Sequence, residues 1–153
     1  MKARAPGKLV LSGAYSVLRG APAIVTAVDR FVWADTSKKS VFSSREVECA
    51  LDRFEQETGA RPVHPFVDAS ALRESDRKLG LGSSAAIVAS CVATLLPPPD
   101  DLDAFRREVF ERSLIAHRLA QGGGSGIDVA ASSFGGTLAA IRTSDELEVT
   151  PLS

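Results

Sequence analysis

The sequence predicts one domain that contains both β-strands and α-helices. Strand-like stretches open and close the chain, and segments with helical spacing of apolar residues lie between them. The chain has 153 residues, of which 44% are hydrophobic. That is enough for one buried core and too little for two ordinary domains. We therefore treat residues 1–153 as a single domain.

Strands are predicted at both ends of the chain. Residues 2–12 and 25–35 carry short apolar, β-branched and aromatic runs, and residues 13–20 between them are expected to form a strand and a turn. Residues 137–143 and 147–151 follow a pair of glycines and predict a closing hairpin.

Two long helices are predicted between these strands. Apolar residues recur at helical spacing over residues 43–57, with Ser44 as the N-cap candidate and Gly59 as the stop. A second helix is predicted over residues 102–120, where Asp100-Asp101 places negative charge at the N-terminus.

The segment of residues 61–72 is interrupted by prolines. Pro62 and Pro65 predict a short edge strand and a loop, because proline cannot donate to a sheet hydrogen bond. His64 lies between them and has no partner in the sequence, so we place it on the surface.

A glycine-rich loop in the middle of the chain is the strongest candidate site. Gly80-Leu81-Gly82-Ser83-Ser84-Ala85-Ala86 leads directly into the apolar run of residues 87–96, which predicts a helix that Pro97-Pro98-Pro99 ends. The N–H groups of the loop and first helical turn are unpaired, and the helix dipole favours negative charge there. A phosphate chain is the expected ligand.

Two common phosphate loops are excluded as explanations. The loop is not a Walker A motif, because no Lys follows Gly82. The dinucleotide fingerprint also fails, because the polar residues 73–78 precede the loop where an apolar strand is required. A glycine-rich helix start that binds no ligand is the remaining alternative.

Two charged residues are further candidates. Lys8 follows Pro6-Gly7 and precedes a buried strand, so it is either a cation at the mouth of a site or a solvated strand end. Asp128 follows Gly124-Ser125-Gly126 in the first turn of a short predicted helix, where the positive helix end favours a carboxylate. An ordinary first-turn Asp is the alternative.

Charge and cysteine content exclude several classes of protein. The net charge of −1 gives no field that would gather nucleic acid or an anionic membrane. Cys49 and Cys91 match no disulfide or zinc-binding spacing. Because the sequence has neither a long apolar run nor an N-terminal signal peptide, we expect a soluble cytoplasmic protein.

Three separated segments together resemble the GHMP kinases. This family includes galactokinase, homoserine kinase, mevalonate kinase and phosphomevalonate kinase. Residues 5–13 and 80–86 resemble its first two signatures, and residues 124–128 resemble its catalytic-aspartate segment. Within the family, residues 116–132 look most like the phosphomevalonate kinase branch.

The resemblance implies an α+β domain like domain 2 of ribosomal protein S5, with a mixed sheet backed by helices. ATP would lie between this N-terminal domain and a C-terminal domain that residues 1–153 do not contain. The implied reaction is ATP-dependent phosphorylation of a small molecule, with phosphomevalonate of the isoprenoid pathway as the acceptor. A hydroxyl acceptor such as mevalonate and a non-catalytic nucleotide-binding half are the alternatives. Without a C-terminal domain we expect inactivity, and a complementing C-terminal chain or a homo-oligomer as partner.

The resemblance also assigns residue roles. The loop that would wrap the nucleotide phosphates consists of Gly80, Leu81, Gly82, Ser83, Ser84, Ala85 and Ala86, and the Ser84 hydroxyl would bind Mg²⁺. Lys8 would neutralise charge near the acceptor and the transferring phosphoryl group, and Asp128 would be the base or orienting carboxylate. Ser125 and Gly126 would contact the substrate.

Two positions depart from the family pattern. Ala14 stands where many members have Glu, and His117 stands where mevalonate kinases have a metal-binding Glu, eleven residues before Asp128. A neutral imidazole is a poor ligand for Mg²⁺ beside hard oxygen donors. The metal would then rest on Ser84, phosphate oxygens and water, which argues against a mevalonate kinase.

Overall fold

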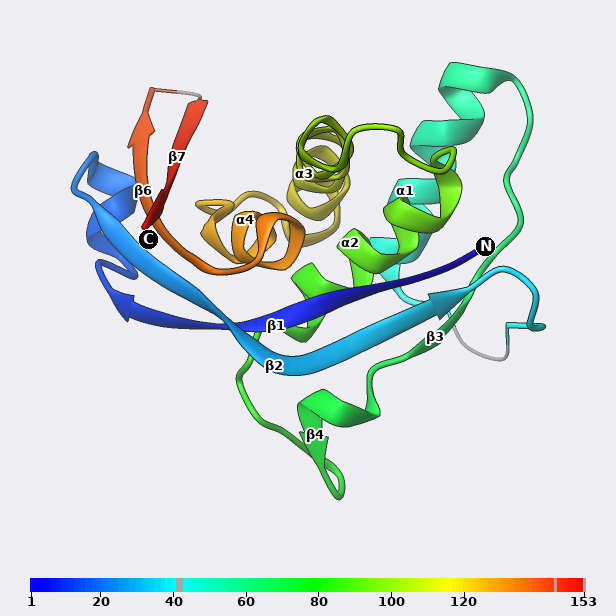
Figure 1. Cartoon of the computed structure of the whole chain (residues 1–153), viewed down its shortest axis with the longest axis horizontal. Helices are drawn as coiled ribbons and strands as arrows, with labels where there is room; N and C mark the ends of the chain where they lie inside the picture. Colours follow the sequence, from blue (N-terminus) through cyan, green and yellow to red (C-terminus); the bar gives the residue numbers. More distant parts are fainter. Residues whose placement is uncertain (41–42, 145, 153) are drawn as a thin grey trace.

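A computed structural model of the chain describes residues 1–40, 43–144 and 146–152. Four α-helices lie on one side of the long strands β1 and β2 (Figure 1). The predicted α+β class, with a sheet backed by helices, is confirmed. Among the described residues, no helix has both the length and the apolar character needed to span a membrane.

The sheet is built around one long strand pair. Strand β1 (Lys2–Ser12) pairs with β2 (Ala23–Asp35), which also pairs with β3 (Phe66–Asp68) and β6 (Thr137–Thr143); β7 (Glu146–Leu152) completes the predicted hairpin with β6. Every pairing among the described strands is antiparallel, so the strand directions differ from the mixed arrangement that the resemblance implies. Residues 13–22 join β1 to β2 and a short connection joins β6 to β7, and direct connections of this kind suit antiparallel neighbours.

Two short elements differ from the prediction. The strand expected within residues 13–20 is a 3₁₀ turn, η1 (Ser16–Arg19), which Gly20 ends in the left-handed conformation at φ 82°. After a second 3₁₀ turn, η2 (Ser70–Leu72), a small hairpin of β4 (Arg73–Glu74) and β5 (Arg77–Lys78) leads into the glycine-rich loop of residues 80–86, which we call the phosphate loop after its expected ligand. In Figure 1 this hairpin lies on the side of β1 and β2 away from the helices.

The helices begin and end close to the predicted positions. Their bounds are α1 Arg45–Thr58, α2 Ser83–Leu95, α3 Leu102–Gln121 and α4 Ile127–Phe134. Ser44 caps α1 by accepting the N–H of Val47, and Gly59 ends it in the left-handed conformation at φ 78°. The Asp101 carboxylate caps α3 by accepting two backbone N–H groups of its first turn, at 2.9 and 3.2 Å.

Helix α2 runs through the centre of the domain. Its buried positions are mostly small, and they are Ala85, Ala86, Val88, Ala89, Ser90, Cys91, Val92, Ala93 and Thr94. Small side chains let the strands and the other helices pack closely around it. The phosphate loop is therefore followed by the most enclosed helix of the fold.

His64 has a partner that the sequence does not reveal, although its side chain stays partly exposed at the surface. The imidazole is half-buried, and its Nε2 lies 3.0 Å from the Ser43 hydroxyl oxygen just before α1. The two residues are 21 positions apart, so the contact depends on how the proline-interrupted loop returns to α1.

The cysteines supply a direct test of this packing. Burial raises the pKa of the Cys91 thiol to about 12, whereas Cys49 is only partly buried. Because the thiolate is the reactive form, we expect Cys91 to react with a thiol reagent only after unfolding. In the native chain, Cys91→Ser should leave the fast-reacting thiol count unchanged and Cys49→Ser should lower it. Fast labelling of Cys91 in the folded chain would contradict the packing of α2.

Candidate active site

The site begins where strand β1 meets the phosphate loop. The β1–β2 register shifts between Pro6 and Lys8, and at this irregularity the Lys8 N–H donates to the Leu81 carbonyl at 2.8 Å. A Cβ on Gly7 would lie 2.8 Å from that carbonyl oxygen, closer than real contacts allow. Glycine at this position therefore lets the loop lie directly against the strand.

The loop turns sharply into α2. Gly80 and Gly82 adopt left-handed φ values of 75° and 71°, which glycine reaches without steric cost. Among the described residues, no side chain caps the start of α2. The first N–H groups of the helix therefore have no cap from any described side chain, and uncapped helix starts of this kind can bind anions.

Lys8 lies inside the site and does not form a solvated strand end. A Cβ on Gly82 would come within 2.6 Å of Lys8 Cε, so the lysine methylenes pass directly against the loop. The ammonium Nζ reaches 3.2 Å from Asp128 Oδ2, with side-chain exposures of 13% for Lys8 and 34% for Asp128. The structure thus brings Lys8, Gly82 and Asp128 together.

A second glycine turn places Asp128. Gly126 has φ 87° and precedes α4, and a Cβ there would lie 2.5 Å from Leu114 Cδ1. The Ser125 hydroxyl accepts the N–H of Ile127 at 3.4 Å, which orients the turn. Asp128 lies in the first turn of α4, so its carboxylate lies close to both the positive helix end and the Lys8 ammonium.

The predicted loop residues differ in what they can offer a ligand. Ala85 and Ala86 are fully buried and offer no side chain to a ligand, and the Ala86 N–H already donates to the Gly82 carbonyl at 3.1 Å. The Leu81 carbonyl is already used in the bond to Lys8. Partly exposed hydroxyls are left at Ser83 and Ser84.

Sequence reasoning missed two contacts at this site. Ser84 Oγ lies 3.2 Å from His117 Nε2 on α3, and the Arg142 guanidinium donates to the Gly124 carbonyl at 3.5 Å. Burial lowers the pKa of His117, and the carboxylates of Asp128 and Glu46 oppose that shift without reversing it. His117 is therefore neutral at neutral pH. The one signal in the sequence that places His117 at the site is its position eleven residues before Asp128.

The residues present fit a magnesium ion that is shared with phosphate. Among the described residues, no group of three or more His, Cys, Asp or Glu side chains is placed to hold a metal. The Ser84 hydroxyl at the start of α2 is a hard oxygen donor, and Mg²⁺ is usually bound by few protein ligands together with substrate phosphates and water.

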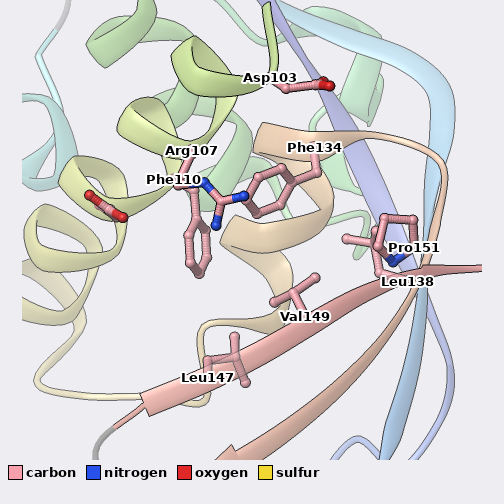
Figure 2. Close-up of a pocket in the computed structure, with 9 residues that line it drawn as sticks. Asp103, Arg107, Phe110, Phe134, Leu138, Leu147, Val149 and Pro151 are labelled. Carbon is pink, nitrogen blue, oxygen red and sulfur yellow. The ribbon is translucent and has the colours of Figure 1, made fainter.

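A separate cavity of about 410 Å³ lies between α3 and the β6–β7 hairpin (Figure 2). Phe110 and Phe134 lie opposite Leu147 and Val149 in Figure 2, and Asp103, Arg107 and Glu111 also line the cavity. None of the predicted site residues is among its lining residues. Its charged lining residues are two carboxylates, Asp103 and Glu111, and one cation, Arg107, so their summed charge does not favour a phosphate chain.

Comparison with known proteins decides the family. Residues 45–136, more than half of the chain, match the family model described as GHMP kinases N terminal domain. The chain belongs to the GHMP kinases. It is 30% identical over 148 residues to mevalonate kinase from Archaeoglobus fulgidus, an alignment that covers 90% of this chain and 51% of that enzyme.

Other GHMP kinases match over different lengths. A phosphomevalonate kinase from Aspergillus fumigatus is 40% identical over 90 residues, which are 56% of this chain and 19% of that protein. The fold is similar to that of Streptococcus pneumoniae phosphomevalonate kinase in complex with phosphomevalonate and AMPPNP, with a TM-score of 0.73, 17% identity, and coverage of 100% of this chain and 59% of that one. This GHMP chain thus spans about half the length of the mevalonate kinase that it matches.

Two glycine substitutions test the contact between Lys8 and the loop. Gly80→Ala and Gly82→Ala both place a side chain at positive φ, which costs about 1 kcal/mol. Only the Cβ added at Gly82 collides with the Lys8 side chain, because a Cβ on Gly80 has no neighbour within 4 Å. We expect Gly82→Ala to lower the free energy of unfolding more than Gly80→Ala, measured by urea denaturation.

The Lys8→Ala background is the control for this comparison. It removes the colliding atoms, so the difference between the two glycine variants should disappear there. Equal losses in the wild-type background would show that Lys8 does not lie against Gly82.

Proposed function

We propose that this chain is the nucleotide-binding half of an ATP-dependent small-molecule kinase of the mevalonate pathway. The observation that carries the proposal is the Lys8–Asp128 ion pair, 3.2 Å long, beside the uncapped start of α2. Phosphoryl transfer needs mainly positioning and charge neutralisation. This arrangement supplies both next to a loop suited to phosphate.

Each residue has a proposed role. The loop of residues 80–86 binds the nucleotide phosphates through backbone N–H groups, and Lys8 neutralises charge between the donor and the acceptor. Ser125 and Gly126 border the acceptor, and Asp128 orients it or takes its proton. Ser84 holds Mg²⁺, which when bound neutralises phosphate charge.

The preferred acceptor is phosphomevalonate. An acceptor phosphate is already anionic near pH 7 and needs cations more than a base. Lys8 lies against Asp128, and Arg142 contacts the turn that precedes it, at Gly124. The resemblance of residues 116–132 to the phosphomevalonate kinase branch supports the same choice.

Mevalonate is the second candidate acceptor. It is favoured by the alignment of 148 residues with a mevalonate kinase, in which the acceptor is a hydroxyl. A hydroxyl gains more from a base, so Asp128 would then matter more. ADP release measured against both acceptors, in an assembly that contains a C-terminal half, decides between them. Release with neither acceptor would leave a non-catalytic nucleotide-binding half.

The first prediction concerns the nucleotide. We expect the chain to bind Mg·ATP weakly by itself, and adenosine less well, because the loop contacts the phosphates and not the base. Isothermal titration calorimetry compares the two ligands. Equal affinity for ATP and adenosine would exclude the phosphate loop as the binding element.

The second prediction concerns Asp128. In an active assembly, Asp128→Asn should lower kcat far more than it changes the KM for ATP, because the carboxylate acts on the acceptor. The loss should approach the range of about 10²- to 10⁴-fold that is typical of general-base catalysis with a hydroxyl acceptor, and be smaller with a phosphate acceptor. An unchanged kcat with both acceptors would remove Asp128 from the mechanism.

The third prediction concerns the partner. The chain spans about half the length of its mevalonate kinase relative, and apolar side chains form part of the lining of the cavity in Figure 2. Such surfaces are commonly covered by a partner. We expect residues 1–153 to self-associate or to bind a separately expressed C-terminal half, and to release ADP only with that half. Sedimentation and ADP release test this. If residues 1–153 form a stable monomer that releases ADP without the C-terminal half, the prediction is contradicted.

A further inference from the structure

Ser84 and His117 join the phosphate loop to a distant helix. Ser84 is the second residue of α2, and His117 lies near the C-terminal end of α3, 33 positions later. Their Oγ and Nε2 atoms are 3.2 Å apart, within hydrogen-bond distance. The hydroxyl proposed to hold the metal therefore has a fixed protein partner on its other side.

The chemistry of the two groups suggests how the hydrogen is shared. A hydroxyl oxygen that binds a cation must direct its lone pairs at the cation, so its hydrogen needs an acceptor elsewhere. His117 is half-buried, and a neutral imidazole offers one acceptor nitrogen. The 3.2 Å separation from Ser84 Oγ places Nε2 where it can accept the hydroxyl hydrogen.

We propose that His117 is a positioning residue whose Nε2 accepts the Ser84 hydroxyl hydrogen. The lone pairs of Ser84 Oγ then face the cation that accompanies the nucleotide phosphates. This inference rests on the proposed function, because it assumes that residues 80–86 bind a nucleotide together with Mg²⁺. Groups that orient a metal ligand in this way commonly change metal affinity or activity by about 10- to 100-fold when removed.

The tautomer of His117 tests the geometry without any ligand. If Nε2 accepts, the proton lies on Nδ1, and long-range ¹H–¹⁵N NMR distinguishes the two forms. The chain has only two histidines, so a His64→Gln variant assigns the signals. We expect the Nδ1–H form in the wild type and a shift toward the Nε2–H form in Ser84→Ala. An Nε2–H form in the wild type would overturn the proposal.

Calorimetry with ATP, in Mg²⁺ or in EDTA, tests the consequence. His117→Phe keeps a planar ring without an acceptor, and His117→Gln keeps a side-chain acceptor. The His117→Phe variant should bind Mg·ATP about tenfold more weakly than the wild type and should bind metal-free ATP equally well. The His117→Gln variant should lose less affinity for Mg·ATP. In a Ser84→Ala background, His117→Phe should have no further effect. Thermal unfolding verifies that each variant is folded.

The outcomes separate this inference from the proposed function. If the wild type binds ATP in neither condition, the proposed function fails and the inference fails with it. If the wild type binds with a clear Mg²⁺ dependence, the variants decide. One contrary result is that Mg²⁺ strengthens ATP binding by His117→Phe as much as by the wild type, and another is that the variant loses equal ATP affinity with and without Mg²⁺. Either result overturns only the role of His117.

Discussion

The close approach of strand β1 to the phosphate loop is the contact on which the candidate site depends. Lys8 makes this contact twice, through its N–H to the Leu81 carbonyl and its methylenes against Gly82, and its ammonium also reaches Asp128 on α4. Because one residue held in the sheet touches both glycine turns, it fixes the N-termini of α2 and α4 relative to each other. Two positive helix ends and one lysine are thereby gathered where a phosphate group would lie.

The core explains why this arrangement is rigid. Helix α2 is buried along most of its length by small residues, so the direction of its N-terminus is set by packing with β1, β2 and the other helices. Helix α4 belongs to a second buried cluster with β6 and α3. Lys8 lies on β1 between Ala5, which belongs to the first cluster, and Val10, which packs against the second. A site built on such elements is positioned more tightly than one carried by a free loop.

Local chemistry was predictable from the sequence, and long-range contacts were not. Caps such as Ser44 and Asp101 act on residues within one helical turn, so their sequence pattern suffices. The Gly80–Ala86 loop is likewise a local signal. The bond between Ser84 and His117 links two helices, and it requires the tertiary fold. The small β4–β5 hairpin escaped prediction because two-residue strands carry almost no pattern.

Nuclear magnetic resonance of the backbone amides, recorded as Mg·ATP is added to the assigned chain, locates the phosphate directly. Bound phosphate should move the amide signals of Ser83, Ser84 and Ala85 most, with smaller changes at the start of α4 beside Asp128. The N–H groups of Ser83, Ser84 and Ala85 form the uncapped first turn of α2. Largest shifts at Arg107, Phe110 and Val149, around the cavity of Figure 2, with the loop signals unmoved, would contradict a phosphate site formed by β1 and α2.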